Sequence, residues 1–271
     1  MKSILVPVNF SACASNAAHY AADLGAALHA QIHLLHVVQI PLASAEMAMT
    51  EDLYNRVLDS ADEGLKELQR DILARTSGQV KIQLHLQTGN ITAEVTEICR
   101  TVSPYLIVFG VTAPTFEKFL AGSPVNALLH LRYPILVVPE DAAWHPYRTI
   151  ALACDETDVN RGVPHSMPLL RELQQRFHPT IDLVTVETSE VLSNEACGFE
   201  SGESRPISGL NPNRHYVRTH SVLQGLEQWL GSRPADLAVV FPKHHSFLEF
   251  HTSRSRALAK NSRIPILSLP E

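Results

Sequence analysis

Short apolar runs alternate with amphipathic stretches along the whole chain. The first half contains four near-continuous apolar runs and one alternating run, at Ile4–Val8, Ile32–Val38, Val80–Leu86, Leu106–Phe109 and Ile135–Val138. Stretches with a helical period separate them, and a long one opening at Thr50 places Leu53, Val57, Ala61, Leu65, Leu68 and Ile72 on one face. Apolar strands alternating with helices are typical of a parallel sheet covered on both faces. We therefore predict an α/β fold with a doubly wound, open, five-stranded parallel sheet.

The second half repeats this order. Tyr105–Gly110 and Tyr133–Glu140 recur as Asp236–Phe241 and Ile264–Glu271. Five strands are expected again, near Ile150–Cys154, Ile181–Val186, His215–Thr219, Leu237–Val240 and Ile266–Leu269. The long second helix has no counterpart, and the polar segment Ser189–Asn213 is expected to be an extended or irregular connection. The repeat predicts two tandem domains, residues 1–140 and 147–271, packed as a pseudo-dimer.

Each copy ends in a strand that carries proline at its start, at Pro134 and Pro265. Proline cannot donate a hydrogen bond to a neighbouring strand, so it favours the edge of a sheet. We expect these two edges to meet, within one chain or between the two chains of a homodimer.

Composition narrows the class of protein. The chain is 45% hydrophobic and 18% charged, which indicates a globular fold. No apolar run approaches the length of a membrane span, so no membrane partner is expected. A net charge of −6 argues against nucleic acid as a partner. The beginning of the chain does not look like a signal peptide and the four cysteines are scattered, so we expect a cytoplasmic protein.

Ligands of open α/β sheets bind beyond the carboxyl ends of the strands. In the first half these positions are Pro7–Ser11, His36–Val38, Thr88–Asn90, Gly110–Ala113 and the later Gly122–Val125. His33 and His36 point to opposite faces of a strand, which makes them a poor metal pair, and each is expected to lie in the core or at a pocket rim.

The motifs at these positions resemble the universal stress protein family, in a tandem form. Ile4–Ser11 matches the family's opening strand and the polar residue, Phe and Ser that follow it, while Pro134–Pro139 and Pro265–Pro270 match its closing strand. The family's ATP-binding members carry a G-x2-G-x9-G-[ST] loop that holds phosphates, and an aspartate after the first strand. The resemblance therefore implies an adenine nucleotide, ATP or AMP, bound by Pro7, Val8, Asn9, Phe10, Ser11, Val38, Gly110, Thr112, Gly122, Ser123, Pro124 and Val125.

The first copy departs from this loop at three points. Ala113 replaces the second glycine, the spacing to Gly122 is one residue shorter, and Asn9 stands in place of the aspartate. Small residues before a helix start let the backbone approach an anion, so the remaining Gly110 and Gly122-Ser123 still fit phosphate binding. A helix start kept for folding alone explains them equally.

The second copy keeps the aspartate, as Asp155, but has Phe241 in place of Gly110. The bulky side chain is expected to crowd a phosphate. A polar set stands there instead, consisting of Asp155, His220, Lys243, His244, His245 and Arg254. It is compatible with an anion site, with a zinc site, or with an ordinary interdomain or oligomer surface, and no pair has the spacing of a known metal motif.

The sequence contains no G-x-S-x-G elbow and no complete Walker loop, and Ser11 and Ser123 are explained as helix caps. We name no catalytic residue and expect a non-catalytic stress-response protein. A ligand-free scaffold for oligomerisation is the main alternative, and a slow ATPase side activity stays open.

Overall fold

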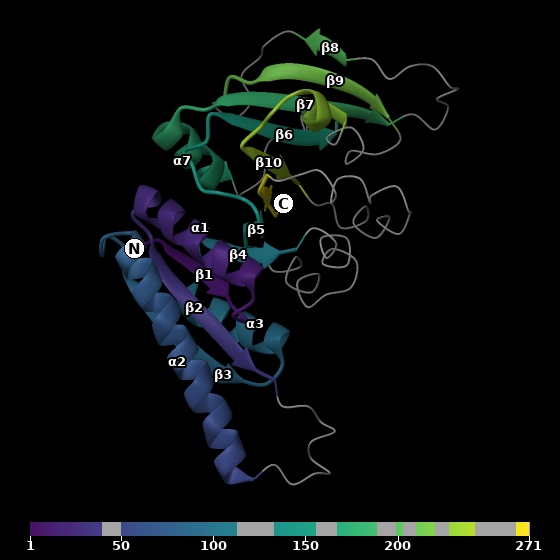
Figure 1. The fold of residues 1–271 in the computed structure, drawn as a ribbon. Helices are drawn as coiled ribbons and strands as arrows, with labels where there is room; N and C mark the ends of the chain where they lie inside the picture. The colour runs from purple at the N-terminus through teal and green to yellow at the C-terminus, as the bar shows by residue number, and fades with distance from the viewer. Residues whose placement is uncertain are drawn as a thin grey trace.

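The computed structural model describes residues 1–39, 50–112, 133–155, 167–188, 199–202, 210–219, 228–241 and 264–270. Their strands form one 11-stranded sheet in the order β3-β2-β1-β4-β5-β11-β10-β6-β7-β9-β8. Figure 1 shows this sheet running through both halves of the chain, with the first half in purple to teal and the second in teal to yellow.

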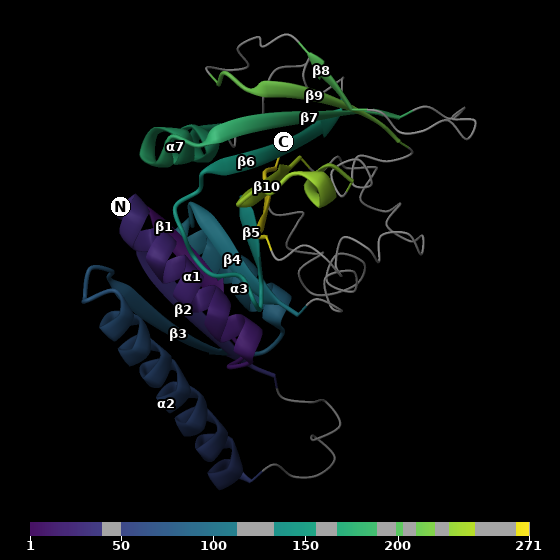
Figure 2. The same ribbon diagram turned by 45° about the horizontal axis from the view of Figure 1, so that its top comes forward.

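The first half has the predicted five parallel strands. Its elements are β1 (Ser3–Pro7), α1 (Ala12–Leu28), β2 (Gln31–Val38), α2 (Glu51–Arg75), β3 (Ile82–Thr88), α3 (Ile91–Val102), β4 (Leu106–Val111) and β5 (Ile135–Pro139). One apolar cluster joins α1 and α2 to the strands, and a second joins α3 to the opposite face. Figure 2 shows α1 and α2 on the same side of β1, β2 and β3. The fold is therefore doubly wound, as predicted.

The second half has the elements β6 (Thr149–Asp155), α7 (Met167–Phe177), β7 (Thr180–Thr188), β8 (Phe199–Gly202), β9 (Asn213–Thr219), β10 (Leu237–Val240) and β11 (Ile266–Ser268). Strand β8 pairs antiparallel with β9, so the described residues of this half form six strands rather than the five expected. The expectation of an extended or irregular Ser189–Asn213 connection missed this short edge strand, because its residues, Phe-Glu-Ser-Gly, have too little apolar alternation to mark it.

The two closing strands meet within the chain. Strand β5 pairs antiparallel with β11, with Leu136 opposite Leu267. The edge contact expected from the prolines is thus intramolecular. The outer edges of the sheet are β3 and β8, and one apolar cluster extends from the first half into the second.

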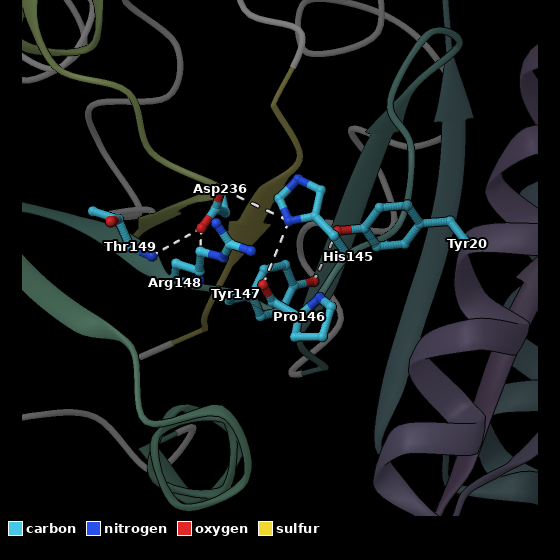
Figure 3. A network of polar contacts seen from close by, with 7 residues as sticks. All are labelled: Tyr20, His145, Pro146, Tyr147, Arg148, Thr149 and Asp236. Carbon is cyan, nitrogen blue, oxygen red and sulfur yellow. Dashed lines mark hydrogen bonds and ion pairs between the residues drawn. The ribbon is translucent and has the colours of Figure 1, made fainter.

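The short connection between the halves is held on both sides. Asn16 of α1 donates to the carbonyl oxygens of Pro139 and Ala142, at 3.0 Å each. The Tyr20 hydroxyl donates to that of Tyr147 at 3.0 Å, as Figure 3 shows. Asp236 accepts from the backbone N–H groups that follow Tyr147 in the chain, at 2.6 and 2.9 Å. The connection is therefore part of the interface between the halves.

A histidine pair lies between two strands of the first half, with His33 buried and His85 half-buried. His33 Nδ1 lies 2.9 Å from His85 Nε2, and the rings stack with centroids 5.2 Å apart. Burial lowers the pKa of both imidazoles, and the neighbouring His85 lowers that of His33 further. His33 Nε2 is buried with no hydrogen-bond partner among the described residues, so a charged ring is poorly accommodated.

This pair predicts that the protein loses stability in mild acid. Unfolded histidine protonates near pH 6.5, while the folded pair resists protonation, so the unfolded chain binds more protons below about pH 6.5. Above that pH the pair should leave the free energy of unfolding unchanged. Below it, the free energy of unfolding should fall as the pH drops towards the lowered pKa values. Urea unfolding at about pH 7.5 and about pH 5.5 measures this loss of free energy of unfolding. His85→Gln should reduce the pH dependence, whereas His29→Asn, at an exposed left-handed helix end, should not. Equal pH dependence in all three proteins would contradict this.

Candidate functional site

The candidate site lies in the first half of the sheet, at the point where the winding of the chain reverses. Strand β1 is flanked by β2 on one side and β4 on the other. The chain leaves β1 through α1 on one face and enters β4 from α3 on the other face. Such a reversal leaves a crevice at the carboxyl ends of the central strands. The fold brings Pro7–Ser11, Val38 and Gly110–Thr112 to this edge of the sheet.

The turn after β1 is closed by its own polar side chains. Asn9 Oδ1 accepts hydrogen bonds from the backbone N–H of Ser11 at 3.1 Å and from its hydroxyl at 2.6 Å. The Ser11 hydroxyl oxygen in turn accepts from the N–H of Ala14, which caps α1 as predicted, and it lies 3.2 Å from Cys13 Sγ. Asn9 is exposed, and its amide nitrogen has no hydrogen-bond partner among the described residues. That N–H group is available to an external ligand.

Gly110 has a structural role that the sequence did not reveal. A Cβ atom placed on it would lie 2.0 Å from the carbonyl oxygen of Cys13 and 2.8 Å from the nitrogen of Ala14. The first turn of α1 therefore packs directly onto the backbone of β4. The resemblance assigned Gly110 to the approach of a phosphate, but the contact with α1 already accounts for the glycine without any ligand.

Phe10 and His36 form an aromatic pair beside this turn. Their rings stack with centroids 4.5 Å apart and planes at 29°. Phe10 has a φ of 60°, which is unusual for a bulky side chain, and it is 38% exposed. A Cβ on Gly64 of α2 would come within 3.0 Å of the Phe10 ring, which explains a glycine in the middle of a long helix.

His36 is further fixed by the end of β1. Its Nδ1 atom lies 2.8 Å from the carbonyl oxygen of Val8. His36 and Val38 lie on the same side of β2, since side chains alternate along a strand. His36 is half-buried, so it lies at the rim of the candidate site, which was one of the two places expected for it.

Several predicted site residues lie outside the described residues. They are Gly122, Ser123, Pro124 and Val125 of the first copy and His220, Lys243, His244, His245 and Arg254 of the second. Asp155 ends strand β6, with Val186 opposite it on β7. Within the described part of the chain, no three His, Cys, Asp or Glu side chains gather in a way that could hold a metal ion.

A polar cluster around the buried Asp182 and His215 in the second half was missed by the sequence reasoning. Asp182 Oδ1 lies 3.0 Å from His215 Nε2 and accepts from the Asn213 amide at 3.1 Å. The Arg233 guanidinium lies 3.2 Å from His215 Nδ1. The polar Asp182 inside an apolar strand was the available signal. The cluster lies at the amino ends of β7 and β9, opposite to the edge where ligands bind, and it links strands rather than forming part of the candidate site.

The first half of the chain matches a known protein family. The model of the universal stress protein family matches residues 1–139. Universal stress protein G of Shigella flexneri is 27% identical over 139 residues, which are 51% of this chain and 98% of that protein. In addition, no helix in the described ranges is long and apolar enough to cross a membrane.

Solved structures resemble both halves together. A universal stress protein from Archaeoglobus fulgidus is 13% identical and has a TM-score of 0.69, with 99% of this chain and 96% of that chain covered. A putative universal stress protein from Pseudomonas aeruginosa is 12% identical and has a TM-score of 0.55, with 100% and 93% covered. At sequence identities this low, the similarity to these structures shows the fold alone. Since the family model covers just over half of the sequence, this chain belongs to the universal stress protein family.

Proposed function

We propose that the first half binds an adenine nucleotide, ATP or AMP, at the carboxyl ends of β1, β2 and β4, and that the protein acts in the cytoplasm as a non-catalytic stress-response protein. The observation that carries this proposal is the placement of Pro7–Ser11, Val38 and Gly110–Thr112 at one edge of the sheet, beyond the carboxyl ends of β1, β2 and β4. This half is also the one that the family model matches. We further propose that residues 1–140 and 147–271 are its two domains.

The arrangement of side chains supports binding rather than catalysis. The Ser11 hydroxyl is engaged by Asn9 and by the first turn of α1, so it is poorly placed to act as a nucleophile. The exposed Asn9 amide can donate to a ribose oxygen. In our proposal the phosphates lie against the segment from Gly122 to Val125.

A ligand-free scaffold is the second candidate. It is favoured by the pairing of β5 with β11 and by the apolar cluster shared between the halves, which give the duplication a structural use whether or not a ligand binds. Association of two chains would then use other surfaces than these closing strands. Calorimetric titration of the full chain with ATP discriminates the two candidates, because the scaffold predicts no saturable heat.

We expect Asn9→Asp to strengthen ATP binding about fivefold. A carboxylate at this position keeps one oxygen for Ser11 and offers the second to a ribose hydroxyl, and hydrogen bonds to a charged acceptor are the stronger kind. The affinity is measured by calorimetry on the full chain, with phosphate release followed on the same samples and expected to stay at background.

Asn9→Ala is the matched control for this substitution. It removes both bonds to Ser11 and should weaken ATP binding. Weaker binding by Asn9→Asp than by the unchanged protein would contradict the assignment of this position to the ribose. Sustained phosphate release that follows the affinities of the variants would contradict the non-catalytic function.

A further inference from the structure

We propose that two copies of the chain associate through strand β3, which pairs antiparallel with the same strand of a second copy about a two-fold axis at His85. This inference goes beyond the proposed function and stands independently of nucleotide binding. It names the partner of a sheet edge that no described strand covers.

Strand β3 leaves one side of its backbone open. It is the last strand on its side of the sheet and pairs with β2 alone among the described strands. The Lys81 carbonyl oxygen accepts from β2 and the Gly89 N–H donates to β2, at 2.8 and 3.0 Å. Backbone groups point alternately to the two sides of a strand, so the odd-numbered residues face β2 and the even-numbered ones face outward. The N–H and C=O groups of Leu84 and Leu86 are therefore available to a further strand.

This edge lacks the features that protect most sheet edges from joining. Charged residues, proline, bulges and short length are the usual protection. The seven residues of β3, Ile82–Thr88, include no charged residue, no proline and no glycine. At the opposite end of the sheet, β8 has four residues, among them Glu200 and Gly202. Gln69 of α2 donates to the Ile82 carbonyl oxygen at 3.4 Å, which closes the start of the β3 edge but not its centre.

The sequence of β3 fits a second copy of itself. Its central residues, Gln83-Leu-His-Leu-Gln87, read the same in both directions. In an antiparallel pair centred on His85, each leucine therefore lies opposite a leucine of the second copy and each glutamine opposite a glutamine. Glutamine amides both donate and accept, so they can bond to each other, and the facing leucines bury apolar surface. A second copy supplies this order directly, whereas a peptide partner would need the same palindrome.

The side chains of β3 have surface left to bury in such a pair. Leu84 and Leu86 are only half-buried, and they pack against the core on the side of α1 and α2. His85 lies on the opposite face, where its contact with His33 at 2.9 Å holds the ring. Burial lowers the pKa of His85, so two neutral rings face each other at the axis at neutral pH. Neither face of the pair brings like charges together.

The proposed contact closes after two copies. Both copies use the same surface, so no third copy can add at this edge. The closing strands β5 and β11 already pair within the chain, which leaves β3 as the long free edge. Pairing uses the side of β3 rather than its carboxyl end, so the candidate nucleotide site stays open. The dimer carries one continuous sheet through both copies.

The test is sedimentation equilibrium of the full chain without nucleotide, from about 1 to about 100 µM, together with three double variants. The unchanged chain should reach twice its single-chain mass in this range. Gln83→Lys with Gln87→Lys places like charges opposite each other, and so does Gln83→Glu with Gln87→Glu. Each should weaken the dimer at least about tenfold. Gln83→Lys with Gln87→Glu is the matched control, because it faces opposite charges, and it should bind as tightly as the unchanged chain or more tightly.

Circular dichroism establishes which variants are folded, and either like-charged variant alone suffices for the comparison. An unchanged chain that is monomeric at about 100 µM would overturn the inference. A dimer that all three variants leave unaffected, or weaken equally, would overturn it too, because the charges at these positions would not face each other. Growth beyond two copies would require two different edges and would also contradict it. None of these results depends on ATP, so the proposed function stands or falls separately.

Discussion

Replacing Gly110 by alanine is expected to lower the free energy of unfolding by about 3 kcal/mol or to prevent folding. The added Cβ would lie 2.0 Å from the carbonyl oxygen and 2.4 Å from the carbonyl carbon of Cys13. Both atoms belong to the backbone of α1, so no side chain can rotate away to relieve the contact. The helix cannot shift freely either, because its apolar face is buried against the sheet.

Urea unfolding monitored by circular dichroism measures this effect. Gly231→Ala is the matched control, because nothing lies within 4 Å of a Cβ at Gly231, and its stability is expected to change by less than about 0.5 kcal/mol. A Gly110→Ala protein as stable as the unchanged chain would show that α1 does not pack on β4 as described. Loss of ATP binding on substitution of Gly110 is therefore no evidence for a phosphate contact, since the same substitution disrupts the fold.

Replacing Tyr147 by alanine is expected to cost about 4 kcal/mol. Tyr147 is only 2% exposed and lies at the junction of the halves. Its ring packs edge-on against Trp144 and Phe177, with centroids 5.3 and 5.6 Å away. Its hydroxyl accepts the hydrogen bond from Tyr20 that Figure 3 shows. The alanine variant would leave a cavity at the junction and a buried Tyr20 hydroxyl without this partner.

Tyr147→Phe separates the two contributions to this effect. It keeps the ring packing and removes the hydroxyl, so it should cost about 1 kcal/mol. The free energies of unfolding of both variants are measured in urea. A cost below about 1 kcal/mol for Tyr147→Ala would contradict the account of the connection between the halves as a packed interface.

The order of elements was predictable because its signals are local. Apolar runs, helix caps such as Ser11 and Thr50, and the repeat of Tyr133–Glu140 by Ile264–Glu271 all lie within short stretches of sequence. The meeting of β5 and β11 was also accessible, since proline marked both edges. Strand β8 was not, because its four residues have almost no pattern of their own.

The candidate site was less accessible, because its geometry depends on contacts between distant segments. The glycine at 64 is explained by the ring of Phe10, and that at 110 by the backbone of Cys13. Neither relation leaves a trace in the spacing of residues along the chain. The resemblance pointed to the strand ends, but the contact between His36 and Val8 is visible only in the folded chain.

The central claim, that the first half binds an adenine nucleotide at the ends of β1 and β2, is tested most directly by an ATP titration of the full chain followed through its methyl NMR signals. We expect the methyl signals of Val8 and Val38 to shift with a dissociation constant below about 1 mM, while those of Val184 and Val217 in the second half stay unchanged. No saturable shift of Val8 and Val38 up to about 10 mM ATP, or shifts confined to the second half, would contradict the claim.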